Sequence, residues 1–118
     1  LNILWTYGVC EGKISRCRLV DLFATTPAKV NGLEKKGRIE IGFDADLVVF
    51  DPDYEGTISA AYNLEGVDYC PFEGFKQKGR AETVFLRGSR IVDNGSYVGT
   101  KGQGKFIPGR PYGLAYGG

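Results

Sequence analysis

The stretch Gly42-Phe43-Asp44-Ala45-Asp46-Leu47-Val48-Val49-Phe50-Asp51 decides how the chain is organised. Its second half, Leu47–Phe50, is a continuous run rich in β-branched side chains, as is typical of a strand covered on both faces. The preceding Arg38–Ile41 alternates polar and apolar residues and predicts a strand with one buried face. Because Pro52 cannot donate to a strand ladder, we expect Asp51-Pro52-Asp53 to end the strand.

Downstream of this stretch, the sequence predicts further short strands and then an arm. Residues 61–82 look irregular, and the segments that follow are short β-rich runs separated by Gly-containing turns. The predicted elements are a weak strand at Gly56–Ala60, strands at Thr83–Leu86 and Arg90–Val92 around the turn Gly88-Ser89, and a second turn at Asp93–Ser96 leading into Tyr97-Val98. In total we expect five or six short antiparallel strands, followed by an extended arm rich in Gly, Pro and basic residues.

Upstream of the central stretch, the apolar residues recur at helical spacing. Residues 1–12 predict a short helix, and Ser15 is placed to cap a second helix over residues 16–25. Thr26-Pro27 predicts the start of a third helix, because Thr can cap it and Pro suits its first turn. Gly32 can close that helix in the left-handed conformation. The period then changes from helix to strand.

Composition excludes several classes of function. The 118 residues suit one domain and contain no histidine, which removes catalytic and metal-binding schemes that need imidazole. The net charge of +1 is too small to predict binding to nucleic acid or an anionic membrane, and no apolar run is long enough to cross a bilayer. Cys10, Cys17 and Cys70 form no C-x-x-C pair, so we expect reduced, mostly buried thiols and a cytoplasmic location. There is no Met, and we interpret Leu1 as a cut end of a longer polypeptide.

Two acidic pairs and one aromatic loop are candidate sites between the strands. Asp44/Asp46 and Asp51/Asp53 could bind a divalent cation or act as acid and base. Both pairs flank a strand at turns, where Asp side chains accept hydrogen bonds from nearby amides, and this turn interpretation is favoured. The loop Tyr69–Phe75 could line a pocket, although such aromatic residues more often cap a core. The residue patterns therefore assign no catalytic, cofactor-binding or metal-binding residue to this chain.

The arm contains two further motifs that fall short of a site. Gly99, Gly104 and Lys105 match a phosphate-binding loop, but Phe106 replaces its Ser or Thr and Pro108 forbids the helix that must follow. Basic and aromatic residues also alternate along the arm, as they do in proteins that bind single strands. These residues are Lys101, Lys105, Arg110, Phe106, Tyr112 and Tyr116. Without a wider basic field, we expect the aromatic side chains to pack against a neighbouring domain or subunit instead.

Several segments together resemble the amidohydrolase superfamily. The residues that carry the resemblance are Thr26-Pro27-Ala28-Lys29 through Gly32-Leu33, Lys36-Gly37-Arg38-Ile39, and Gly42–Asp51. Two more segments, Tyr7–Ser15 and Val67–Gly74, are similar to the D-hydantoinase/dihydropyrimidinase branch. The resemblance extends from Tyr7 to about Pro111.

The resemblance implies an α+β fragment of a larger enzyme that hydrolyses the ring amide of hydantoins or dihydropyrimidines. Residues 1–33 would be the last helices of a TIM-like barrel, 34–100 the C-terminal part of a small antiparallel β-sandwich, and 101–118 an extended arm. The family's two divalent metals, with zinc expected, would be bound upstream, and Lys29 does not match the family's carboxylated lysine. This chain would supply scaffold and subunit contacts, with the missing barrel and sandwich strands as partners in a homodimer or homotetramer.

Two alternatives remain open from the sequence. Collapsin-response-mediator-like binding proteins share the fold and the C-terminal pattern without a metal site. They tend to lack the Pro that Pro71 supplies before Phe-Glu-Gly, which favours the enzymes. The other alternative is a free-standing β-rich binding module.

Overall fold

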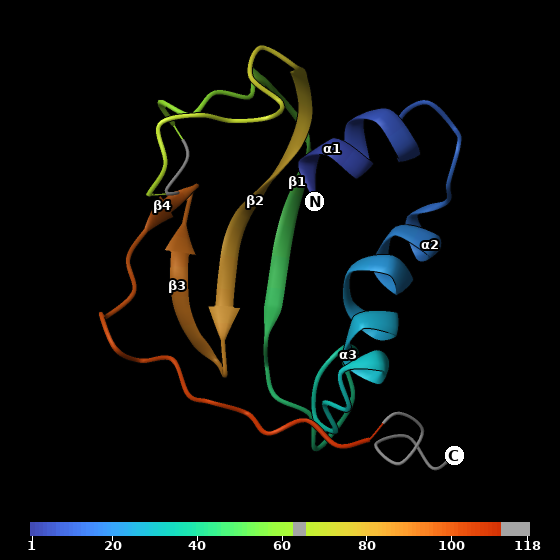
Figure 1. Cartoon of the computed structure of the whole chain (residues 1–118), viewed down its shortest axis with the longest axis vertical. Helices are drawn as coiled ribbons and strands as arrows, with labels where there is room; N and C mark the ends of the chain where they lie inside the picture. The colour runs from blue at the N-terminus through green and yellow to red at the C-terminus, as the bar shows by residue number, and fades with distance from the viewer. Residues whose placement is uncertain (63–65, 112–118) are drawn as a thin grey trace.

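The computed structural model describes residues 1–62 and 66–111 and places helices beside an antiparallel sheet (Figure 1). The helical segments are α1 (Asn2–Leu4), η1 (Trp5–Val9), α2 (Arg16–Val20), η2 (Asp21–Thr25) and α3 (Thr26–Val30), where η denotes a π-helical turn. The strands are β1 (Leu47–Thr57), β2 (Lys76–Leu86), β3 (Ser89–Asp93) and β4 (Ser96–Tyr97), and they lie in the order β1-β2-β3-β4. Helices followed by an antiparallel sheet agree with the predicted α+β class. The described residues contain four strands, fewer than the five or six expected.

The helical part begins where the sequence predicts it. Residues 2–9 form one helical run, and Ser15 caps the next, with its Oγ accepting a hydrogen bond from the Arg18 amide at 3.1 Å. Ser15 thus pairs one of the amides that a helix start leaves unsatisfied. None of the helices in the described residues is long and apolar enough to cross a membrane.

The prediction of a separate third helix starting at Thr26 is wrong. Residues 16–30 form one continuous helical run, in which α2 passes through the π-turn η2 into α3. The Thr26 hydroxyl donates to Asp21 Oδ1 at 2.8 Å instead of capping an amide. Within a continuous helix the amides already have partners, so the cap has no function. The closure by Gly32 is confirmed, because this residue has φ +63° and the Leu33 amide donates to the Ala28 carbonyl at 2.8 Å.

The predicted strand at residues 38–41 does not form. The Phe43 amide donates to the Glu40 carbonyl at 3.1 Å, which makes a local turn, and Arg38 forms an ion pair with Glu40 at 2.8 Å. Strand-like alternation is realised only when a neighbouring strand supplies hydrogen bonds. No strand of the described residues pairs with this segment.

Strands β1 and β2 are longer than predicted. Strand β1 continues through Pro52, because its register with β2 shifts between Asp51 and Glu55 and no ladder bond is required of the proline there. Strand β2 begins at Lys76, inside the segment expected to be irregular. Val48 and Val49 are 52% and 50% exposed, so the described residues do not cover both faces of β1 as expected.

The two hairpin turns depend on residues with positive φ. Arg87 and Gly88 form the first turn, with φ +47° and +80°, one residue earlier than the predicted Gly88-Ser89. Asn94 and Gly95 form the second, with φ +47° and +77°, within the predicted Asp93–Ser96. Positive φ at both central residues matches the right-handed twist of a hairpin.

The core lies where the helices meet β1 and β2. The buried apolar residues are Trp5, Leu19 and Ala28, and the Trp5 ring lies 4.9 Å from the ring of Phe50 on β1. Thr6 ties η1 to β2, because its hydroxyl accepts a hydrogen bond from the Lys78 amide at 2.9 Å. Helices and sheet are therefore joined by the Trp5–Phe50 ring pair and by side-chain hydrogen bonds from η1 to β2, which include one from the Tyr7 hydroxyl to the Lys76 carbonyl at 3.1 Å.

The arm after β4 turns back towards the helices (Figure 1). It contains no regular secondary structure over residues 98–111, and the last of these residues lie beside α3. There the Arg110 amide donates to the Gly32 carbonyl at 3.0 Å, and the Arg110 guanidinium pairs with Glu34 at 3.1 Å. The arm thus closes on the loop that follows the helices.

Candidate functional site

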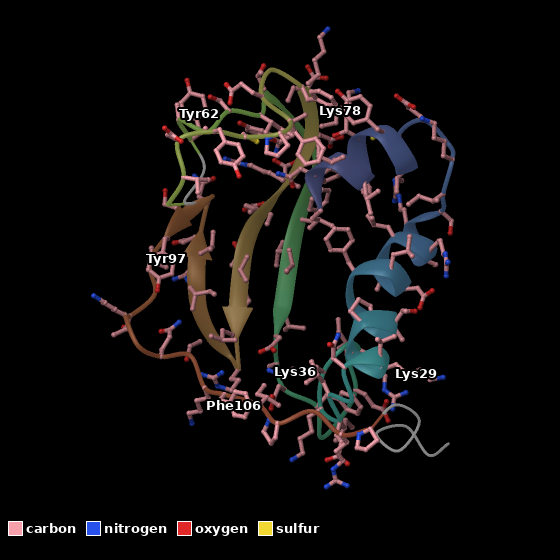
Figure 2. The ribbon with its side chains drawn as sticks, viewed as in Figure 1. Lys29, Lys36, Tyr62, Lys78, Tyr97 and Phe106 are labelled. Carbon is pink, nitrogen blue, oxygen red and sulfur yellow. The ribbon has the colours of Figure 1, made fainter. Side chains whose placement is uncertain are left out.

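The acidic pair Asp44/Asp46 lies just before β1 and surrounds a lysine. Lys36 Nζ lies 2.9 Å from Asp44 Oδ2 and also pairs with Asp46 Oδ2. The Lys36 side chain is 13% exposed and lies at the end of the sheet near α3 (Figure 2). Asp46 Oδ1 accepts from the Arg87 amide at 2.8 Å, so one carboxylate joins the lysine to the β2–β3 turn.

The charges of this cluster stabilise one another. Partial burial alone would lower the pKa of Lys36, but hydrogen bonds and charge interactions with Asp46 and Asp44 outweigh it and raise that pKa. The hydrogen bond from Lys36 in turn lowers the pKa of Asp44. Lys36 and Asp44 therefore stay ionised at neutral pH. The cluster holds three segments together: residues 34–37, the connection to β1, and the β2–β3 turn.

No metal-binding group is present in the described residues. They contain no group of three or more Cys, Asp or Glu side chains able to hold a metal ion, and the whole chain has no histidine. Asp44 and Asp46 are occupied by Lys36, and Asp51 Oδ1 accepts from the Asp53 amide at 3.0 Å within the irregular part of β1. Carboxylates of both acidic pairs therefore accept hydrogen bonds from a nearby amine or amide.

The aromatic loop is built around Phe75 and Glu73. The Phe75 ring lies 5.7 Å from Tyr7 and 5.8 Å from Phe72, in edge-to-face contacts that attach the loop to η1. Glu73 Oε2 accepts from the Ala60 amide at 2.8 Å, and this bond, with a second from Ser59, lowers the pKa of Glu73. Residues 63–65 lie outside the described part of the chain.

Two open hollows border this loop and the sheet. One, of about 340 Å³, is bordered by Ile3, Ile58, Cys70 and Phe72 among others. The other, of about 640 Å³, contains Arg80, whose guanidinium lies 4.6 Å from the centre of the Tyr54 ring and donates to Asn94 Oδ1 at 2.9 Å. Arg80 thereby ties β2 to the β3–β4 turn. This role of Arg80 could not be predicted from the sequence, because Arg80 and Asn94 are brought together only by strand pairing.

In residues 98–111 of the arm, the motif residues lie apart from one another in roles other than ligand binding. No helix follows Lys105 in residues 106–111, as the sequence predicts, so the helix end that a phosphate-binding loop requires is missing there. Arg110 is paired with Glu34, while Phe106 is 92% exposed. Tyr112 and Tyr116 lie outside the described residues.

The cysteines differ from the expectation of buried thiols. Cys10 and Cys17 are exposed and Cys70 is half-buried, and all three are free. The two exposed thiols follow from their places, on the turn after η1 and in the first turn of α2. Neither position faces the core around Trp5.

Comparison with known proteins places the chain in a family. The profile of the amidohydrolase family matches residues 6–91. The chain is 49% identical to D-hydantoinase from Ralstonia pickettii over 89% of its own length and 23% of that protein. It is 38% identical to rat dihydropyrimidinase over 95% of its length and 22% of that enzyme.

Solved structures agree with the sequence comparison. D-hydantoinase from Bacillus sp. AR9 superposes with a TM-score of 0.89 at 39% identity, covering 94% of this chain and 25% of that one. D-hydantoinase from Thermus sp. gives 0.89 at 46% identity, covering 94% and 24%. The chain thus spans about a quarter of the length of these relatives. The family profile, the sequence relatives and the superposed structures together show that this chain belongs to the amidohydrolase family.

Proposed function

We propose that this chain is the C-terminal scaffold segment of a cyclic amidohydrolase that opens the ring amide of hydantoins or dihydropyrimidines. The observation that carries the proposal is the match to D-hydantoinases over 89–96% of the chain at 43–49% identity. The matched region is about a quarter of each relative, so the residues that perform the reaction would lie in the remainder.

The chain's own residues support a structural role. The metals implied by the family need a donor set that the described residues do not supply, since their carboxylates are spread singly or in pairs and pair with lysines and amides. The residues that are well anchored, Lys36, Arg80 and Glu73, connect segments of this chain to one another. No step of hydrolysis is therefore assigned to a residue of this chain.

The proposed arrangement has three parts. Residues 1–33 belong to the last helices of the barrel, 34–100 to the sandwich, and 101–118 to an arm in contact with another subunit of a homo-oligomer. The third assignment is supported by the exposed Phe106, which lies on an arm that contacts the helix end at Arg110. A cytoplasmic location is proposed with it, on the free cysteines.

The test compares the protein from the complete reading frame with the 118-residue chain. Both are incubated with Zn²⁺ and with dihydrouracil or hydantoin, and ring opening is followed by the loss of ultraviolet absorbance. We expect turnover by the complete protein and none by the chain. Turnover by the repurified chain would refute the scaffold role. A folded complete protein that hydrolyses neither compound would favour the non-catalytic, collapsin-response-mediator-like alternative, which the named relatives do not support.

A further inference from the structure

Residues 38–41 present two isoleucines to solvent from a segment that has a strand pattern. Ile39 is 89% exposed and Ile41 is 102% exposed, and the latter is the largest exposure of any large hydrophobic residue in the described chain. Neither residue takes part in any hydrogen bond given by the described structure. Exposed apolar side chains and backbone groups without a hydrogen bond thus occur together at Ile39 and Ile41, while the Glu40 carbonyl between them accepts from the Phe43 amide. Such a segment is a template for pairing with another strand.

The segment is held in place on both sides. Before it, Gly37 packs on the helices, where its carbonyl accepts from Thr25 Oγ1 at 3.0 Å, and a β-carbon at Gly37 would lie 2.6 Å from that of Ala28. After it, the Asp44 amide donates to the Lys35 carbonyl at 3.0 Å, and Asp44 pairs with Lys36. The two isoleucines therefore project from a loop closed at its base by the charged cluster. A site held in this way loses little conformational entropy when it binds.

The place of the segment favours pairing within one polypeptide. Only residues 42–46 separate it from β1, and β1 is an edge strand of the sheet, with a partner on one side in the described residues. The relatives that superpose on this chain are about four times as long, so most of the parent lies elsewhere. Tethering to the same chain gives a covering segment a high effective concentration, which a second copy lacks.

We propose that residues 38–41, the docking edge, receive an extended apolar segment from the remaining part of the parent polypeptide, which buries Ile39 and Ile41. The inference rests on the proposed function for the existence of that parent. It goes further by naming the residues at which this segment joins the rest of the protein.

The test uses hydrogen exchange on the protein from the complete reading frame. We expect the amides of residues 39–41 to exchange at least about 100-fold more slowly than in an unstructured peptide. The protection should be the same at all protein concentrations. Exchange at the unstructured rate would overturn the proposal. Protection lost on dilution to the monomer would also overturn it, because the covering segment would then come from a second copy.

Substitutions supply an independent measurement. Ile39→Ser and Ile41→Ser should each lower the melting temperature of the complete protein by at least about 2 °C. Glu40→Gln, between them, is the matched control and should leave it unchanged within error. Isoleucine variants that melt together with the control would contradict burial at the docking edge. Hydrolysis is not measured in either experiment, so an inactive but protected protein would refute the proposed function and leave this inference standing.

Discussion

The contact between the arm and the residues that follow α3 leaves no room for an added methyl group. Gly32 has φ +63°, and a β-carbon built on it would lie 1.8 Å from the Arg110 carbonyl oxygen and 2.4 Å from its amide nitrogen. On the other side of the contact, a β-carbon at Gly109 would lie 2.4 Å from the Asn31 oxygen. Two glycines therefore allow two backbones to touch. We expect Gly32→Ala to separate them.

The expected loss combines two effects. A residue with a β-carbon in the left-handed region costs about 1–3 kcal/mol. Releasing the arm also gives up the bond from the Arg110 amide to the Gly32 carbonyl, which is 3.0 Å long and worth about 0.5–1.5 kcal/mol. The exposed pair of Arg110 and Glu34 adds little, since surface ion pairs are screened by solvent. The free energy of unfolding should therefore fall by about 1.5–4.5 kcal/mol.

The measurement is made on the complete protein, with Gly102→Ala as the control. Gly102 has φ +84° but no atom within 4 Å of its β-carbon position, so its substitution introduces backbone strain without a collision. Urea unfolding gives the change in free energy, and limited trypsin digestion at Lys105 reports release of the arm. Gly32→Ala should be cleaved faster than Gly102→Ala. Equal cleavage rates and equal stabilities for the two variants would refute the reasoning.

Further predictions concern the charged cluster, the aromatic loop and the core, all in the complete protein. Asp46→Ala should lower the free energy of unfolding by about 1–3 kcal/mol, because the Arg87 amide loses its acceptor. Asp46→Asn keeps an acceptor for that amide and is the control. If urea unfolding shows the same loss of free energy for both variants, the hydrogen bond to Arg87 is not the cause. The pKa of Glu73 is lowered in the folded state, so its contribution to stability is present above pH 4.5 and lost as the pH falls through the folded-state pKa. Melting curves from pH 6 to 3 should thus fall less steeply for Glu73→Gln, and parallel curves would count against the assignment. Gly79→Ala should lower the free energy of unfolding by about 2–4 kcal/mol, because Gly79 has φ +69° and its β-carbon would lie 2.5 Å from the Phe50 ring. Gly42→Ala is the control, because Gly42 has φ +92° and no atom within 4 Å of its β-carbon position. Equal urea unfolding midpoints for the two variants would exclude the collision with Phe50.

Features that depend on neighbouring residues in the chain were predictable from sequence. Ser15 caps α2, Gly32 closes α3 and Asn94-Gly95 makes a hairpin turn, because each needs only the backbone a few residues away. Family membership was visible in the motif around Asp44–Asp51.

Features that depend on distant partners were decided by the tertiary structure. Pro52 lies inside β1 because the register with β2 shifts there, and Arg80 is anchored because β3 brings Asn94 beside it. The alternation at residues 38–41 predicted a strand, yet no described strand lies next to it, and Ile39 and Ile41 stay in solvent. A sequence pattern specifies which face of a segment can be buried, whereas hydrogen-bond partners and covering surface come from elsewhere in the fold. Local chemistry therefore determined the caps and turns, and pairing across the chain determined which segments became strands.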